Sequence, residues 1–153
     1  MRVIGELRLS GEQKLDLRRR ARVVSVQVLY ETDRSQHDPT VALERRLKDG
    51  ILNLSSSDYS RLLINGILEN REKIDKIVME YATAWPINQI AVVDKNILRI
   101  AVFEIMFGDG VPYKVAINEA IEMSKIYGTD KSPGFVNGVL GSLMDSLILM
   151  GKA

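Results

Sequence analysis

The stretch from Leu17 to Tyr30 places the strongest constraint on how this chain can fold. Its sequence, LRRRARVVSVQVLY, repeats apolar residues at helical spacing, and these share one face: Leu17, Ala21, Val24 and Val28. Four arginines lie opposite that face or on its flank: Arg18, Arg19, Arg20 and Arg22. The stretch therefore predicts a helix that buries one side in a core and holds a cluster of positive charge in water near its start.

Positive charge at the start of a helix is unfavourable by itself. The helix dipole places partial positive charge at that end, so each arginine there costs roughly a few tenths of a kcal/mol. An anionic partner such as RNA phosphate would offset this cost. A solvated charged face is the alternative interpretation, and the composition alone leaves both open.

The composition of the chain narrows the class of protein. Its 153 residues, 46% hydrophobic and 27% charged, are typical of one soluble globular domain. The net charge is only +1, so any affinity for nucleic acid must come from local clustering of cations. There is no cysteine and only one histidine, His37, which we expect in a loop. We therefore expect no disulfide, no metal and no cofactor.

The sequence also bears on the compartment. No stretch approaches the ~18 to 20 uninterrupted apolar residues that a membrane span needs. The first residues, MRVIGELRLSGEQK, lack the apolar run and cleavage site of a signal peptide. We therefore expect a cytoplasmic protein without membrane contact.

Apolar spacing and turn residues predict a single all-α domain of about seven helices with short connections and no β-sheet. The predicted helices are 14–33, 40–48, 58–70, 70–83, 87–107, 113–127 and 134–150, with one long helix over 58–83 as the alternative to a bend at Asn70. Residues 1–13 are expected to be an N-terminal extension, and 14–150 the helical domain. In the apolar helix over 87–107, the polar residues gather on one side and predict an exposed strip: Asp94, Lys95, Asn96 and Arg99.

The sequence offers little for catalysis. It contains no Gly-rich phosphate loop, no GxSxG nucleophile motif and no pair of histidines at metal-ligand spacing. The helical carboxylates show no convergent partner: Asp94, Glu104, Glu119 and Glu122. Glu104 interrupts an apolar run, which favours an ion pair with Arg99 or with a neighbouring helix. We expect a protein that is not an enzyme.

Two asparagines interrupt apolar helical stretches. Asn118 follows Val115-Ala116-Ile117, and Asn137 lies between Val136 and Gly138. A buried asparagine without hydrogen bonds costs about 1–3 kcal/mol, so we expect both to be bonded to a neighbouring helix or loop and to fix the packing. Direct contact with a ligand is the alternative.

Three separated blocks of sequence resemble the NusB family of bacterial transcription antitermination factors. The first contains RRRAR at 18–22 and VQVLY at 26–30; the second contains VVDKNILRIA at 92–101 and VPYKVAINEAIE at 111–122; the third is KSPGFVNGVL at 131–140. Between 31 and 86 the chain is similar to the family mainly in its helical pattern. The resemblance implies an all-helical fold of two packed subdomains and no catalysis.

The same resemblance implies partners. Members of the family bind a short single-stranded RNA element, boxA, in ribosomal RNA leader transcripts. They do so together with a small-subunit ribosomal protein, NusE, within an antitermination complex on RNA polymerase. By this resemblance the RNA-binding candidates at the helix start are Arg18, Arg19, Arg20 and Arg22. Four further residues match positions at or near the same surface: Tyr30, Asp94, Arg99 and Phe135.

The residue types agree with RNA binding. Arginine contacts phosphate bidentately, and aromatic faces stack on unpaired bases. Lys131 stands where some relatives carry an acid, which should strengthen affinity for RNA if its loop lies nearby. Plain core packing is the alternative for Tyr30 and Phe135. Trp85 is expected at the edge of the domain, with base stacking as its alternative.

Two other functions stay open at this point. The same domain resembles an RNA-binding module attached to ribosomal RNA cytosine methyltransferases, although this chain has no methyl-donor-binding Gly-rich loop. The other is a helical protein-interaction domain without RNA binding. The apolar segment Leu147-Ile148-Leu149-Met150 covers the core or meets another subunit, and the sequence leaves a homodimer open.

Overall fold

The computed structural model describes the backbone of residues 11–108 and 110–152, and the side chains within these ranges from Asp16 onward. It contains seven α-helices and no strand among these residues, which confirms the predicted fold class. The helices are α1 (Gly11–Arg34), α2 (Pro39–Leu47), α3 (Leu54–Glu69), α4 (Arg71–Tyr81), α5 (Val92–Met106), α6 (Tyr113–Tyr127) and α7 (Ser132–Leu149).

The N-terminal boundary differs from the prediction. Residues 1–10 of the expected extension lie outside the described residues. Residues 11–13 belong to the first turn of α1, which begins three residues before the predicted start at residue 14.

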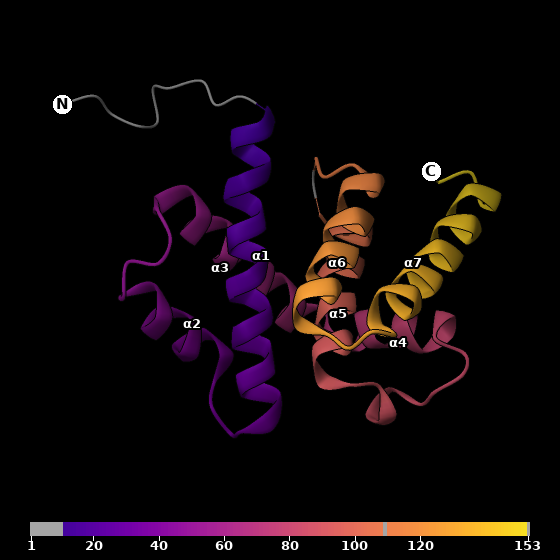
Figure 1. Cartoon of the computed structure of the whole chain (residues 1–153), viewed down its shortest axis with the longest axis horizontal. Helices are drawn as coiled ribbons and strands as arrows, with labels where there is room; N and C mark the ends of the chain where they lie inside the picture. The colour runs from indigo at the N-terminus through magenta and orange to yellow at the C-terminus, as the bar shows by residue number, and fades with distance from the viewer. Residues whose placement is uncertain (1–10, 109, 153) are drawn as a thin grey trace.

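The helices form two groups that share one core. Helices α1, α2 and α3 pack on one another, and α5 packs on α4, α6 and α7. Figure 1 shows α2 and α3 on one side of α1, with α6 and α7 on the other. Helix α1 contacts both α3 and α5, so it joins the two groups. One continuous cluster of buried apolar side chains runs through both.

Capping side chains explain several helix boundaries. The Asp38 carboxylate accepts a hydrogen bond from the Thr40 amide at 2.8 Å, and Pro39 occupies the first position of α2. The Asn53 side chain accepts from the Ser56 amide, which starts α3 at Leu54, before the predicted residue 58. Asn70 ends α3 and precedes α4, so the break predicted there is confirmed.

The predicted helix over 87–107 is shorter in the structure. Residues Ile87–Gln89 form a 3₁₀ turn, η2, and α5 begins only at Val92. Between them Ile90 and Ala91 are extended, with ψ angles of 135° and 137°. This bend turns the Ile90 side chain into the core, where it is buried, and places Asp94 in the first turn of α5.

Two expectations about exposure are wrong. The polar strip of α5 is not exposed: Asn96 and Arg99 are buried where α1 and α4 pack on α5, and Asp94 is buried beside the start of α7. Asn118 and Asn137 are exposed, since the outward faces of α6 and α7 carry no further layer among the described residues.

No helix in the described ranges has the length and apolar character to cross a bilayer.

The apolar tail divides between core and solvent. Leu147 is buried, whereas Ile148, Leu149 and Met150 are exposed at the end of α7. Only the first residue of the segment therefore covers the core.

Candidate nucleic-acid interface

The arginines at the start of α1 separate into two kinds. Arg19 and Arg20 have side chains 51% and 62% exposed, and Arg18 is half-buried. Arg22 is buried, with 1% of its side chain exposed. The expectation that the whole cluster lies in water is therefore wrong for Arg22, because α1 is covered by α3 on one side and by α5 on another.

Arg22 is held by carboxylates from two other helices. Its Nε and Nη2 donate to the two oxygens of Glu104, each at 2.8 Å, and its Nη1 donates to Glu119 at 3.4 Å. The Tyr59 hydroxyl donates a short hydrogen bond to Glu104. The predicted ion pair of Glu104 with a neighbouring helix is confirmed, with Arg22 as the partner. In this arrangement Arg22 has no route to a phosphate.

The electrostatics of this group follow from burial and pairing. Burial alone would lower the pKa of Arg22, but the hydrogen bond and charge of Glu104 outweigh burial and raise that pKa. Burial raises the pKa of Tyr59, and the adjacent Glu104 carboxylate raises it further. Arg22 therefore stays charged and Tyr59 stays a hydrogen-bond donor.

The guanidinium groups of Arg19 and Arg18 are held by side chains from other helices. The Arg19 Nε donates to both oxygens of the buried Glu119, each at 3.1 Å. Its two terminal nitrogens make no further hydrogen bond to the described side chains. The Arg18 guanidinium lies 4.8 Å from the centre of the Tyr59 ring, at cation–π distance. Both side chains are thus oriented by groups that the fold has already fixed.

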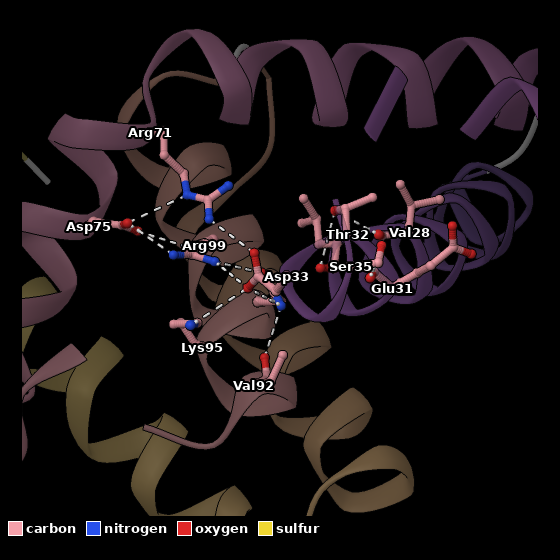
Figure 2. Close-up of polar contacts among 12 residues, drawn as sticks. Val28, Glu31, Thr32, Asp33, Ser35, Arg71, Asp75, Val92, Lys95 and Arg99 are labelled. Carbon is pink, nitrogen blue, oxygen red and sulfur yellow. Dashed lines mark hydrogen bonds and ion pairs between the residues drawn. The ribbon is translucent and has the colours of Figure 1, made fainter. Parts of the chain in front are cut away.

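The other end of α1 carries a second ion-pair group, drawn in Figure 2. Asp33 accepts from Arg99 Nη1 at 2.8 Å and from Arg71 Nη2 at 3.0 Å. Arg99 also donates its Nε and Nη2 to Asp75, at 2.7 and 3.0 Å. Arg99 was expected at the RNA surface, but it is buried and joins α1, α4 and α5.

Asp33 stays ionised despite its burial. Burial alone would raise its pKa, but the charges of Arg99 and Arg71 and a hydrogen bond from Asn96 outweigh this and lower it. The group is therefore an internal contact between the two halves of the fold.

Three other predicted site residues meet at one pocket. Asp94, Lys131 and Phe135 line a surface pocket of about 300 Å³, together with Trp85 and Gln89. The tight turn between α6 and α7 brings Lys131 and Phe135 there. A Cβ on Gly128 would lie 2.4 Å from the Ser132 Oγ, so only glycine allows this close approach.

Tyr30 lies apart from that pocket. It is exposed, with the Arg34 guanidinium 5.4 Å from its ring centre. It lines a second, larger pocket of about 590 Å³ that also includes Tyr127 and Arg46. The alternative of plain core packing is therefore excluded for Tyr30, while Phe135 is half-buried.

The structure thus places the predicted site residues in four locations. Three arginines are at the solvent side of the α1 start, Tyr30 is at the end of α1, three residues share the smaller pocket, and Arg22 and Arg99 are interior. Sequence reasoning missed Tyr59 and Glu119, which hold the arginines. It found no partner for Glu119, because that partner is 100 positions away in the chain.

Comparison with known proteins defines the class of this helical domain. The transcription antitermination protein NusB of Chloroflexus aggregans is 41% identical over 92% of this chain and 92% of its own length. The structure of T. maritima NusB matches with a TM-score of 0.78 and 38% identity, over 82% of this chain and 89% of that one. The Chloroflexus relative carries the name transcription antitermination protein, and both carry the name NusB.

The family itself is shown directly. The NusB family model matches residues 19–145, and the chain belongs to the NusB family. The same fold occurs in a crystal structure of the antitermination factors NusB and NusE in complex with double-stranded RNA, with a TM-score of 0.78 and 24% identity, over 86% of this chain and 98% of that one. At that identity the likeness concerns the fold alone.

Proposed function

We propose that this chain is an antitermination factor that binds boxA-type single-stranded RNA of ribosomal RNA leader transcripts. In this proposal it acts with the small-subunit ribosomal protein NusE and joins an antitermination complex on RNA polymerase. Membership of the NusB family supports the proposal, as does the surface at the start of α1.

The observation that carries the proposal is the cationic surface formed by Arg18, Arg19 and Arg20. Arg19 is held by Glu119 through its Nε, and its side chain is 51% exposed, which leaves its two terminal nitrogens for the bidentate contact that arginine makes with phosphate. Arg18 is held over Tyr59. Because these guanidinium groups are oriented before RNA arrives, binding loses less side-chain entropy than it would with free arginines.

The proposal also covers activity and compartment. We propose that the chain works by binding, without catalysis, and in the cytoplasm, as expected for a partner of nascent transcripts. A module like those attached to ribosomal RNA methyltransferases is less well supported. The match to the relative from Chloroflexus aggregans extends over 92% of that protein, and that protein carries the antitermination name.

The test is a binding titration with fluorescent boxA-like RNA, with and without NusE, over a range of salt concentrations. Arg18→Gln, Arg19→Gln and Arg20→Gln together should weaken binding and flatten its salt dependence by about 0.7 in log–log slope per lost contact, or about 2 in all. The matched control removes three lysines elsewhere, with Lys73→Gln, Lys76→Gln and Lys125→Gln. If the arginine variant binds with unchanged affinity and slope, the assignment of this surface is wrong.

A further inference from the structure

A buried acid contacts the cationic surface formed by Arg18, Arg19 and Arg20. This acid is Glu119 of α6, and only 5% of its side chain is exposed. Both of its oxygens accept from the Arg19 Nε, each at 3.1 Å, and one also accepts from the Arg22 Nη1 at 3.4 Å. By charge alone, an acid this close to Arg19 weakens the attraction of the surface for phosphate.

Stability accounts for only part of this contact. The buried Glu119 carboxylate needs a counter-charge, and Arg22 provides one inside the protein. Arg19 is half-exposed, and an ion pair with an exposed partner contributes little stability because water screens it. What the contact does change is the freedom of the Arg19 side chain, which is long and would otherwise sample many rotamers.

The atoms that form the contact determine what remains for a ligand. A guanidinium carries five N–H groups on three nitrogens. Glu119 accepts from the Nε of Arg19, and the two terminal nitrogens make no hydrogen bond to the described side chains. An arginine can therefore be fixed by a carboxylate and still offer phosphate a bidentate contact. A lysine has a single nitrogen, which the carboxylate would occupy.

We propose that Glu119 is a positioning residue for RNA: it fixes Arg19 for contact with phosphate, and this acid thereby increases affinity for an anionic ligand. This inference rests on the proposed function. Fixing the side chain in advance spares binding the loss of its rotamer freedom, which corresponds to about two- to ten-fold in affinity for one long side chain. The expected effect of Glu119 is opposite in sign to the effect of its charge alone.

Glu122 provides a matched control on the same helix. It follows Glu119 by three positions, and its side chain is 53% exposed. The hydrogen bond and charge of Glu119 raise the pKa of Arg19, and the charge of Glu122 raises that pKa further. Both acids therefore act on Arg19 by charge, but of the two only Glu119 accepts a hydrogen bond from its guanidinium. Loss of either charge favours phosphate, whereas only loss of Glu119 releases Arg19.

The test is a titration of the full chain and NusE with fluorescent boxA-like RNA. Glu119→Met should weaken RNA binding about two- to ten-fold, whereas Glu122→Met should bind RNA at least as tightly as the parent. Arg19→Lys should lose nearly as much affinity as Arg19→Gln, although the lysine keeps the charge. In an Arg19→Gln background, Glu119→Met should cause no further loss, because Glu119 acts through Arg19. Melting curves of each variant confirm that it is folded.

Four results would contradict the inference. If Glu119→Met binds RNA as tightly as the parent or more tightly, the positioning role is wrong and the proposed function is intact. If Glu119→Met causes the same loss with and without Arg19, it acts by another route and the inference fails. Unchanged binding by Arg19→Lys also overturns it, and this exposed variant decides the question if Glu119→Met does not fold. Absence of RNA binding by the parent overturns both the inference and the proposed function.

Discussion

The two ends of α1 use charge in opposite ways. At its start, Arg18, Arg19 and Arg20 reach solvent while Arg22 is buried against carboxylates of α5 and α6. At its end the arrangement is reversed: the acid Asp33 comes from α1, and the cations Arg99, Arg71 and Lys95 come from α4 and α5. At the end of the helix, the Asp33 carboxylate is therefore paired inside the protein. At its start, three of the four arginines lie at the surface.

The difference shows that a charged residue on this helix cannot be assigned to a function by its type. Arg19 and Arg22 are three positions apart, and both contact Glu119. Arg22 also contacts Glu104 and Tyr59 and is buried, whereas Arg19, among the described side chains, pairs with Glu119 alone and stays half-exposed. The number of buried partners separates the structural arginine from the one available to a ligand. The predictions below test this separation.

The largest effect is expected for Arg22→Met. The change leaves Glu104 and Glu119 buried without their main counter-charge, and breaking a buried pair in this way costs about 3–5 kcal/mol. Urea unfolding measures the loss in free energy of unfolding. The control Arg20→Met should change stability by no more than about 0.5 kcal/mol, because Arg20 is exposed. Equal stability of the two variants would show that the buried Arg22 contributes no more to stability than the exposed Arg20.

The next effect concerns the other end of the helix. Asp33→Asn removes the acceptor charge shared by Arg99, Arg71 and Lys95, and should lower stability at neutral pH by about 2 kcal/mol, as for hydrogen bonds to charged groups. The pKa of Asp33 is lowered in the folded protein. Its stabilising contribution is therefore present above the unfolded pKa of about 3.9 and is lost as the pH falls through the folded pKa.

This pH dependence gives a second measurement on the same variant. The difference in free energy of unfolding between the parent and Asp33→Asn should be constant at neutral pH and should shrink as the pH falls below about 4. A difference that stays constant down to pH 2 would show that the Asp33 charge does not stabilise this end of α1.

A smaller effect is expected for Tyr59→Phe. The ring remains, so the contacts with Arg18 and Arg22 over its face are kept, and only the hydrogen bond to Glu104 is lost. The expected loss is about 1.5 kcal/mol, the lower end for a bond to a charged group. Thermal unfolding of both proteins measures it. Unchanged stability would mean that Arg22 alone satisfies Glu104.

The smallest effect is expected for Asn137→Leu, because Asn137 is exposed and makes no side-chain hydrogen bond to the described residues. Stability should change by no more than about 0.5 kcal/mol. The contrasting variant is Asn96→Leu: Asn96 is buried and donates to Asp33 and to the Val92 carbonyl, so its loss should cost about 1–3 kcal/mol. If the two variants lose similar stability, burial is not what distinguishes these asparagines.

The helices were predictable because the residues that determine where each one begins and ends are close together in the sequence. Helix starts depend on residues such as Asp38 and Asn53, whose side chains bond to amides two or three positions later. Apolar spacing then identifies the helices between these points. The boundary before α5 was missed because nothing local stops a helix at Ile90; its extended backbone follows from burial of its side chain in a core formed by distant segments.

The candidate site was predictable only in part, because its contacts are distant in sequence. Apolar spacing identified one buried face of α1, but a helix packed on both α3 and α5 has a wider buried arc, and Arg22 falls within it. For Arg99, the deciding contact with Asp33 joins residues 66 positions apart. The family resemblance selected Asp94 and Phe135, and Lys131 was added as a departure from the family pattern; the structure places all three at one pocket.

The distance between Arg22 and its partners has a consequence for synthesis on the ribosome. Glu104 and Glu119 follow Arg22 by 82 and 97 positions. At about 5–20 residues per second, translation of that interval takes roughly 5 to 20 s. During this time the nascent chain contains Arg22 together with Arg18, Arg19 and Arg20, while the carboxylates that pair with Arg22 are still being synthesised. Until Glu104 and Glu119 are in place, the positive charge of Arg22 is unpaired and adds to the cationic start of α1. Folding of α5 and α6 onto α1 then neutralises that charge locally.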